Sequence, residues 1–383
     1  MSEYRDRAVV WRHSFIKGVE SMVETLIMRD IMNTPDSLRD TLAQIGDQGD
    51  ALAGALLAQG ARRLLAVGNG TSYYAAVAAA YLHNGLISPY GTLVGAAPTG
   101  DFSLYPAPLS ERDVLVGVSV SGEVVDLLDL CERLRGRHRI VGITNVPDST
   151  LARLADDLLV TQAGRSLVPT STKTFTTTVA ALYLLWLGLL KRQGVEEAAP
   201  VRRELHSMPD LVAQSLAQAR GQIDDLADRL GRCQRLFVIG AGPSWAMAQE
   251  AALVLKEVST IPAEAVQLRE MAQGTTAVVD ETVGVIVINP PGPGEPIGKQ
   301  ILALCSEMGA TTIEVGNAPA GLHIRVSCHD LLAPLIYSGP LFMLASELAA
   351  RRGVDTDHPR WEAAYLRATR RGSAGTRNDT SAR

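Results

Sequence analysis

Short apolar runs alternate along the chain with longer stretches in which small and apolar residues recur at helical spacing. The run at 64–67 ends in the glycine-rich segment Gly68-Asn69-Gly70-Thr71-Ser72, and residues 73–82 then have helical length. This order predicts a strand, a glycine loop and a helix. Apolar runs at 114–118 and 140–143 are followed in the same way. Strands that alternate with helices predict an α/β fold with a doubly wound parallel sheet.

The second half of the chain repeats the pattern of the first at a constant offset of 172 residues. The offset sets Arg63 against Arg235, and it aligns small residues after them: Gly68 with Gly240, Gly70 with Gly242, Ser72 with Ser244, and Ala76 with Ala248. Farther on, it places Asn145 on Asn317, each close to the end of an expected strand. A repeat of this length predicts two tandem copies of one α/β domain.

The pattern also predicts the boundaries of these domains. We expect a helical lead-in at 1–44, a first domain at 45–190, a linker at 191–203, a second domain at 204–371 and a tail at 372–383. The linker is charged and carries Gly194 and Pro200. The tail consists mostly of Ser, Gly, Thr, Asn and Arg, a composition that predicts disorder.

Composition and charge narrow the class of protein and of partner. With 383 residues, 46% hydrophobic and 20% charged, the chain is globular and long enough for two domains. The net charge is −5 and no basic run is interleaved with aromatic residues, so we expect no nucleic-acid partner. The longest apolar run, 179–190, is shorter than the roughly 18 residues of a membrane span, and we expect a buried helix instead.

Cysteine and histidine usage favours a reducing compartment without a metal site. The four cysteines form no CxxC, and the N-terminus lacks the apolar segment of a signal peptide, so we expect a cytoplasmic protein that does not bind membranes. The histidines form no H-E-x-x-H motif; His323, Cys328 and His329 lie close together but beside an expected strand, where packing explains them better. We expect neither a metal nor a cofactor.

Hydroxyl side chains gather where the strands of the first domain end, which is where doubly wound sheets bind ligands. These residues are Thr71, Ser72, Ser119, Ser121, Ser171 and Thr172. Short hydroxyls, glycines and helix N-termini together favour a phosphate. The alternative is that each hydroxyl only caps a helix. A nucleotide is less well supported, because Gly68-Asn69-Gly70 lacks the third glycine of G-x-G-x-x-G and no Walker sequence occurs. The G-x-S-x-G motif of serine hydrolases is also absent.

Residues 45–365 resemble the sugar isomerase (SIS) domain proteins, in the tandem arrangement of the isomerase half of glutamine–fructose-6-phosphate aminotransferase and of related amino-sugar-phosphate deaminases. The segments that carry the resemblance are Gly70-Thr71-Ser72-Tyr73, Ser119-Val120-Ser121-Gly122-Glu123, Ser171-Thr172-Lys173, Glu250 with Leu255-Lys256-Glu257, Ala263-Glu264-Ala265 and Asp355-Thr356-Asp357-His358-Pro359-Arg360. The resemblance implies two SIS domains and a phosphosugar held by Thr71, Ser72, Ser119 and Ser121. Val124 stands where the family has a further phosphate-binding threonine.

The resemblance also implies a reaction, in which a proton moves between C1 and C2 of an open-chain sugar through an enediol or enolamine. By resemblance the base is Glu257, and partial burial would suit it by raising its pKa. From the residues alone, a glutamate after Lys256 on a helix would more commonly lie on a solvated face.

Two family residues are replaced in this chain. Gln273 stands in place of the histidine that opens the sugar ring, and glutamine cannot act as acid or base. Ala364 stands in place of the lysine that takes the sugar carbonyl. His358 lies nearby in sequence, and we hypothesise that it substitutes as a proton donor.

These observations support two functions from different classes. The first is a phosphosugar enzyme, an aldose–ketose isomerase or an amino-sugar-phosphate deaminase or deglycase; the second is a non-catalytic phosphosugar sensor or regulatory subunit. No N-terminal cysteine nucleophile precedes the lead-in, so we expect no glutaminase activity. The resemblance implies a homodimer, and the apolar helices expected at 179–190 and 332–350 offer surface for a second copy.

Overall fold

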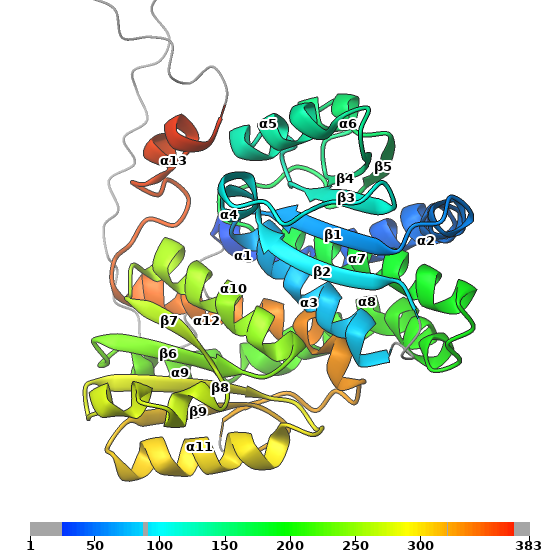
Figure 1. Cartoon of the computed structure of the whole chain (residues 1–383). Helices are drawn as coiled ribbons and strands as arrows, with labels where there is room; N and C mark the ends of the chain where they lie inside the picture. The colour runs from blue at the N-terminus through cyan, green and yellow to red at the C-terminus, as the bar shows by residue number, and fades with distance from the viewer. Residues whose placement is uncertain (1–24, 87–90, 320, 371–383) are drawn as a thin grey trace, which may run out of the picture.

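The computed structural model describes residues 25–86, 91–319 and 321–370, and it contains two five-stranded sheets (Figure 1). Every strand pairs with its neighbours in parallel. The first sheet has the order β2 (Leu93–Pro98), β1 (Arg63–Gly68), β3 (Asp113–Val118), β4 (Arg139–Thr144), β5 (Asp157–Val160). The second has the order β7 (Ala263–Gln267), β6 (Arg235–Gly240), β8 (Val283–Asn289), β9 (Thr311–Gly316), β10 (Leu322–His323). The α/β fold with two doubly wound sheets is therefore confirmed.

The two sheets are copies of one topology, because β6 to β10 follow the same spatial order as β1 to β5. The 172-residue offset brings β1 onto β6, and the expected strands at 64–67, 114–118 and 140–143 lie within β1, β3 and β4. The repeat read from the sequence is thus a structural repeat. In each copy the first strand lies between the second and the third. The chain therefore passes to one side of the first strand to form the second, and then returns to its other side to form the third.

A layer of helices lies between the two sheets (Figure 1). It contains α3 (Thr71–Leu86), α7 (Lys173–Arg192), α10 (Pro243–Val254) and α12 (Ala333–Arg351). The outer face of the first sheet is covered by α4 (Thr99–Leu104), α5 (Val125–Leu134) and α6 (Thr150–Leu154), and that of the second by α11 (Glu295–Glu307). One hydrophobic core runs through the central layer and joins both domains.

The expected buried helix at 179–190 is confirmed as part of α7, in which every residue from Lys173 to Leu190 is buried. By length and composition α7 and the segment Asp330–Arg351 could each cross a membrane, but 100% and 94% of their apolar windows are buried. They are core helices of the folded chain. Our expectation that 179–190 and 332–350 offer surface to a second copy was wrong, because packing within the chain already covers both.

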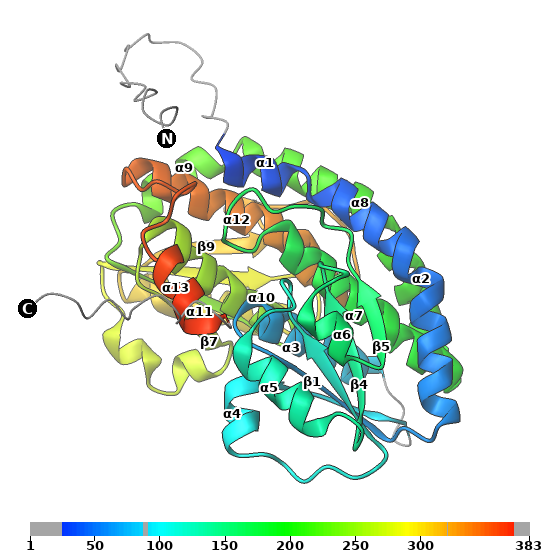
Figure 2. The same cartoon turned by 90° about the horizontal axis from the view of Figure 1, so that it is seen from above.

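The lead-in helices α1 (Leu26–Met32) and α2 (Thr34–Ala58) pack on this core beside α8 (Ala198–Arg220), as Figure 2 shows. A buried ion pair fastens α1 to α7, since Nζ of Lys173 lies 2.9 Å from Oδ1 of Asp30. Residues 198–203 of the expected linker form the start of α8. After α8 comes α9 (Ile223–Leu230), and the last helix of the described residues is α13 (Glu362–Thr369). The expected disordered tail and residues 1–24 of the lead-in lie outside the described residues.

Candidate phosphosugar cavity

A cavity of about 430 Å³ opens at the carboxyl ends of β1 and β3. Because β1 and β3 are neighbours whose connections run to opposite sides, the loops that follow them separate and leave a crevice. The cavity is lined by Asn69, Gly70, Thr71, Ser72, Val118, Ser119, Val120, Ser121, Val124, Leu127, Pro169, Ser171, Leu253, Glu257, Trp361, Glu362, Tyr365, Leu366, Thr369 and Arg370. Segments far apart in the sequence thus meet here, and they include six of the eight site residues that the sequence suggested.

The serines of the loop after β3 cap backbone groups and also line the cavity. Oγ of Ser119 accepts a hydrogen bond from the N–H of Gly122 at 3.1 Å, and Oγ of Ser121 accepts one from the N–H of Glu123 at 3.3 Å. A hydroxyl that accepts in this way keeps its own proton to donate. Gly122 has a φ of +66°, and a Cβ there would lie 2.2 Å from Oγ of Ser149, so the loop requires glycine. Capping and ligand binding are therefore compatible at these serines.

The other hydroxyls divide into two groups. Ser72 and Ser171 line the cavity, as does Thr71, whose Oγ1 donates to Oε1 of Glu250 at 3.0 Å. Thr172, in contrast, is buried outside the cavity lining, where its backbone oxygen accepts from Phe175 at the start of α7. The structure therefore does not bring Thr172 to the cavity.

Glu257 lies on η1 (Leu255–Ser259), a short π-helix that continues α10 and faces the cavity. The wider turn of a π-helix changes the direction of the side chains that it carries, and such turns are frequent at functional sites. Burial raises the pKa of Glu257 to about 7, although a hydrogen bond from Thr170 and the charge of Lys256 act to lower it. A carboxyl group with this pKa is partly protonated and partly ionised at neutral pH, as a group that exchanges protons must be.

A second glutamate, Glu250, lies two turns earlier on α10 and is completely buried. Burial raises its pKa well above the usual range, the negative charge of Glu257 raises it further, and the hydrogen bond from Thr71 acts against both. The protonated form of Glu250 is therefore favoured. It supports the hydroxyl of Thr71, which lines the cavity.

One wall of the cavity comes from α13, whose Trp361, Tyr365 and Arg370 sequence reasoning missed. Nε1 of Trp361 donates to the backbone oxygen of Glu257 at 3.0 Å, and its ring packs edge-on against Tyr365. Arg370 pairs with Val124 through an antiparallel bridge and is the one basic residue among the described residues that line the cavity. The sequence signal for this wall is weak: two aromatic residues at helical spacing, a pattern that equally indicates packing.

Three residues that the sequence singled out lie elsewhere in the described structure. The side chain of His358 is 85% exposed, and its Nδ1 lies 3.3 Å from Oδ2 of Asp355. Gln273 and Ala364, which replace the family histidine and lysine, are both exposed. None of the three lines the cavity.

Comparison with known proteins agrees with this geometry. A family model described as "SIS domain" matches residues 57–188 and 229–350. The chain is 34% identical over 348 residues to the isomerizing glutamine–fructose-6-phosphate aminotransferase of Pyrobaculum aerophilum, covering 87% of this chain and 56% of that protein. It is 31% identical over 373 residues to the enzyme of the same name from Gloeobacter violaceus, covering 92% and 60%. The chain thus spans little more than half the length of these relatives.

Solved structures share the fold. The C-terminal domain of glucosamine-fructose-6-phosphate aminotransferase from Francisella tularensis superposes with a TM-score of 0.80 at 24% identity, covering 88% of this chain and 98% of that domain. Glucosamine-6-phosphate deaminase from Thermotoga maritima superposes with a TM-score of 0.70, also at 24% identity, with the same coverage. Both comparisons extend over the two sheets and the helical layer between them.

Proposed function

The chain belongs to the SIS domain family, and we propose that it is an enzyme that moves a proton between C1 and C2 of a phosphorylated sugar. The reaction would be an aldose–ketose isomerisation or the deamination of an amino-sugar phosphate, the chemistries named by its relatives. One observation supports the proposal above the others: a carboxyl group with a pKa of about 7, Glu257, shares a cavity with Ser119 and Ser121.

The phosphate would lie at the end of the cavity formed by the loops after β1 and β3. There Ser72, Ser119 and Ser121 offer hydroxyl donors. Helix α5 begins just beyond them at Val125, and its N-cap residue Val124 makes no capping hydrogen bond through its side chain. The first N–H groups of α5 are therefore available to an anion, at the positive end of the helix. Arg370 adds a positive charge in the wall beside Val124.

Glu257 would take the proton from one carbon and return it to the next. Only the ionised form can accept a proton, and only the protonated form can return it, so a pKa near neutral pH suits both halves of the reaction. Glu250 does not compete for this role because it is completely buried and does not line the cavity. Trp361 and Tyr365 would cover the sugar and limit the access of water.

Neither histidine nor lysine is found among the described residues that line the cavity. The reaction that we propose therefore starts from the open-chain sugar and forms no Schiff base with a lysine of the described chain. His358 is exposed and does not line the cavity, so it can donate a proton to the sugar only if it lines the cavity of a second copy of the chain. The variant His358→Asn tests this: an unchanged rate of turnover would remove His358 from the mechanism.

The deciding experiment is proton NMR in D₂O with hexose, pentose and hexosamine phosphates, which reads binding by saturation transfer and proton abstraction by loss of the C1 or C2 signal. We expect one sugar phosphate to exchange, Glu257→Gln to bind it without exchange, and Ser121→Ala to weaken binding about tenfold or more. Glu264→Gln, which changes an exposed carboxylate on β7, is the matched control and keeps the rate.

Binding without exchange in the wild-type protein would instead favour a non-catalytic phosphosugar sensor, which agrees with the replacement of the family histidine and lysine by Gln273 and Ala364. Exchange that persists in Glu257→Gln would contradict the assignment of Glu257 as the base.

A further inference from the structure

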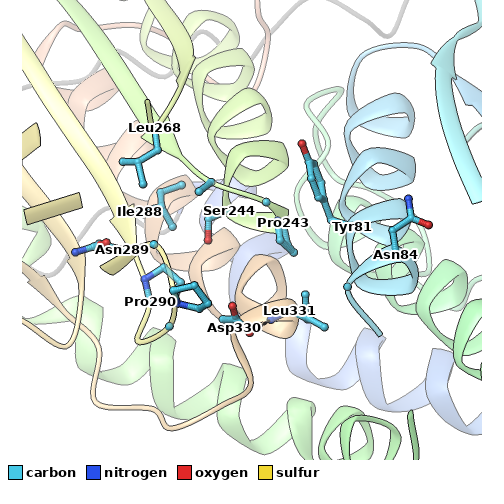
Figure 3. Close-up of a pocket in the computed structure, with 16 residues that line it drawn as sticks. Tyr81, Asn84, Pro243, Ser244, Leu268, Ile288, Asn289, Pro290, Asp330 and Leu331 are labelled. Carbon is cyan, nitrogen blue, oxygen red and sulfur yellow. Dashed lines mark hydrogen bonds between the residues drawn. The ribbon is translucent and has the colours of Figure 1, made fainter. Parts of the chain in front are cut away.

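A second cavity, of about 410 Å³, occupies the corresponding place in the second domain, at the carboxyl ends of β6 and β8 (Figure 3). It is lined by Tyr81, Asn84, Gly85, Ala241, Gly242, Pro243, Ser244, Leu268, Ile288, Asn289, Pro290, Gly292, Pro293, Gly294, Asp330 and Leu331. Like β1 and β3, the strands β6 and β8 are neighbours whose connections run to opposite sides. Each copy of the domain therefore has a crevice at the position where doubly wound sheets bind ligands.

The structural repeat extends to the backbone of the loop that forms this second cavity. Gly242, the partner of Gly70 at the 172-residue offset, has a φ of +54°, and Gly70 has a φ of +51°. Ser244 is the partner of Ser72, and both serines are buried and line their cavities. The loop after β6 has thus kept the shape of the loop after β1.

The chemistry of the lining, however, has changed. Pro243 replaces Thr71 at the same offset, whereas the strand register, which sets Val283 of β8 in the place of Asp113 of β3, puts Asn289 and Pro291 in the places of Ser119 and Ser121. Three hydroxyls and two N–H donors are therefore absent, and the side-chain amide of Asn289 already donates to Glu314 and to the backbone oxygen of Glu295. Asp330 adds a carboxylate, and the described lining residues include no basic one. Helices α10 and α11 begin at this cavity, and their N-termini carry partial positive charges. The full negative charge of the Asp330 carboxylate opposes these partial charges. A phosphate is therefore disfavoured, whereas a cation is favoured.

Ser244 indicates that a ligand with hydroxyl groups fits this cavity. Only 2% of the residue is exposed, its hydroxyl makes no hydrogen bond with the described residues, and Figure 3 shows the oxygen directed into the cavity. The hydroxyl is therefore free to donate to, or accept from, a ligand in the cavity. Helix α3 forms the opposite side of the cavity through Tyr81 and Asn84. The ring of Tyr81 packs edge-on against Trp245, and 38% of Tyr81 remains exposed.

Asp330 has one oxygen free for a cation. Its Oδ1 accepts from the backbone N–H of Leu331 at 3.0 Å and lies 2.9 Å from Nδ1 of His329. Its Oδ2 makes no hydrogen bond with the described residues and lies beside Gly292, where a Cβ would approach it to 3.0 Å. The glycine leaves room around this oxygen.

We propose that the second cavity binds an unphosphorylated sugar that bears a protonated amine, that is, a free hexosamine. Oδ2 of Asp330 would hold the ammonium group, Ser244 would hydrogen-bond a ring hydroxyl, and Tyr81 would contact the apolar face of the sugar ring. This site lies outside the cavity that holds Glu257 and does not depend on the activity proposed for it.

The test is calorimetric titration of the full chain with glucosamine, glucose and glucosamine 6-phosphate. We expect glucosamine to bind more tightly than glucose. Asp330→Asn keeps the shape of the side chain but removes its charge, and we expect it to weaken glucosamine binding about tenfold or more while leaving glucose unaffected. Ser244→Ala should weaken the binding of both sugars, and neither variant should change the affinity for glucosamine 6-phosphate.

Ser72→Ala is the matched control, because it removes the equivalent hydroxyl of the first cavity and should leave glucosamine binding unchanged. The proposal is overturned if glucosamine does not bind at millimolar concentration, if it binds wild type and Asp330→Asn equally, or if Ser72→Ala abolishes its binding. Far-ultraviolet circular dichroism confirms that each variant is folded. Failure of the proposed enzymatic function would be visible separately, as loss of exchange or of glucosamine 6-phosphate binding with glucosamine binding intact.

Discussion

Glu250 and Glu257 lie two turns apart on one continuous helical segment, and their surroundings give them different properties. Glu250 is completely buried against Thr71, whereas Glu257 reaches the cavity and is only partly buried. Burial disfavours the charged form of a carboxyl group, so it raises the pKa of Glu250 well above its usual value and the pKa of Glu257 to about 7. One of them can therefore support the binding loop while the other exchanges protons.

The pH dependence of proton exchange should follow the pKa of Glu257. Below pH 7 the ionised fraction falls about tenfold for each pH unit, so we expect the exchange rate to fall in the same proportion below pH 7 and to level off above it. The rate of deuterium incorporation into the sugar, measured between pH 5 and pH 9, checks this. A rate that stays constant from pH 5 to pH 8 would contradict the role of Glu257 as base.

Glu250 should make the stability of the protein decrease with rising pH. Its pKa is raised on folding, so above the ordinary value of 4.5 the folded protein holds a proton that the unfolded chain has released. The contribution of Glu250 to stability is therefore complete below pH 4.5 and is lost as the pH rises. Because glutamine has no such proton, we expect Glu250→Gln to gain at least about 1 kcal/mol relative to wild type between pH 4.5 and pH 8.

Urea unfolding of both proteins at the two pH values measures this difference, part of which comes from the negative charge of Glu257, because that charge raises the pKa of Glu250. Glu264→Gln, which makes the same substitution at an exposed position, is the control. An equal gain in Glu250→Gln and Glu264→Gln would mean that Glu250 is not the group responsible.

Among the helices, η1 and α13 together shape the cavity that the strand loops open. The π-helix η1 turns Glu257 toward the cavity, and α13 closes one side of it through Trp361 and Arg370. Strand β1 and helix α3 match their expected positions closely, because alternation and helical periodicity are local properties of the sequence. The π-helix was not expected, since a single widened turn leaves no periodic signal, and α13 carries few apolar positions from which packing could be inferred.

Trp361→Phe tests the contact between these two helices. The substitution removes the hydrogen bond from Nε1 to the backbone oxygen of Glu257 but keeps an aromatic ring, so we expect a loss of about 1 kcal/mol in stability and a several-fold slower proton exchange. Amide hydrogen exchange should become faster in α13. Tyr365→Phe is the matched control, because the hydroxyl of Tyr365 makes no hydrogen bond with the described residues and the ring contact is kept. Equal effects of the two substitutions would show that the hydrogen bond does not position Glu257.

For the molecule as a whole, the duplicated domain places two cavities at equivalent strand ends and joins the sheets through one core. Helix α3 contributes to both, with Thr71 and Ser72 at its start and Tyr81 and Asn84 near its end. Duplication kept the backbone of the crevice and changed its side chains, because packing constrains the loop shape while the lining is free to vary. The two cavities therefore offer different groups to a ligand: hydroxyls and Arg370 in the first, prolines and Asp330 in the second.

We expect the protein to be a homodimer in solution, as the family resemblance implies. The central helices cannot provide the interface, because α7 and α12 are already buried within the chain. Light scattering coupled to size-exclusion chromatography should give a mass of about twice 40.9 kDa. A mass near 40.9 kDa at micromolar concentration would contradict this expectation.

Periodicity and repetition in the sequence predicted the fold class, the duplication and the strand ends where Ser72, Ser119 and Ser121 lie, because these features depend on residues close together in the chain. Contacts between distant residues depend on the packed structure. Thr71 meets Glu250 across 179 positions, and Trp361 meets Glu257 across 104. The same packing buries both glutamates, which raises their pKa values, and it leaves the cavity open. No local sequence pattern encodes the burial or the cavity.

The same reason explains the residues that the structure placed elsewhere. Lys173 follows the hydroxyl pair at 171–172 but is held by the buried carboxylate of Asp30, and His358 follows Asp357 but lies on the surface beside Asp355. Both residues are next to candidate site residues or family motifs in the sequence. In the folded chain, however, the side chain of each turns toward its acidic partner, Asp30 or Asp355. A sequence pattern can thus locate a binding loop, but charge and access at that loop come from the segments that fold against it.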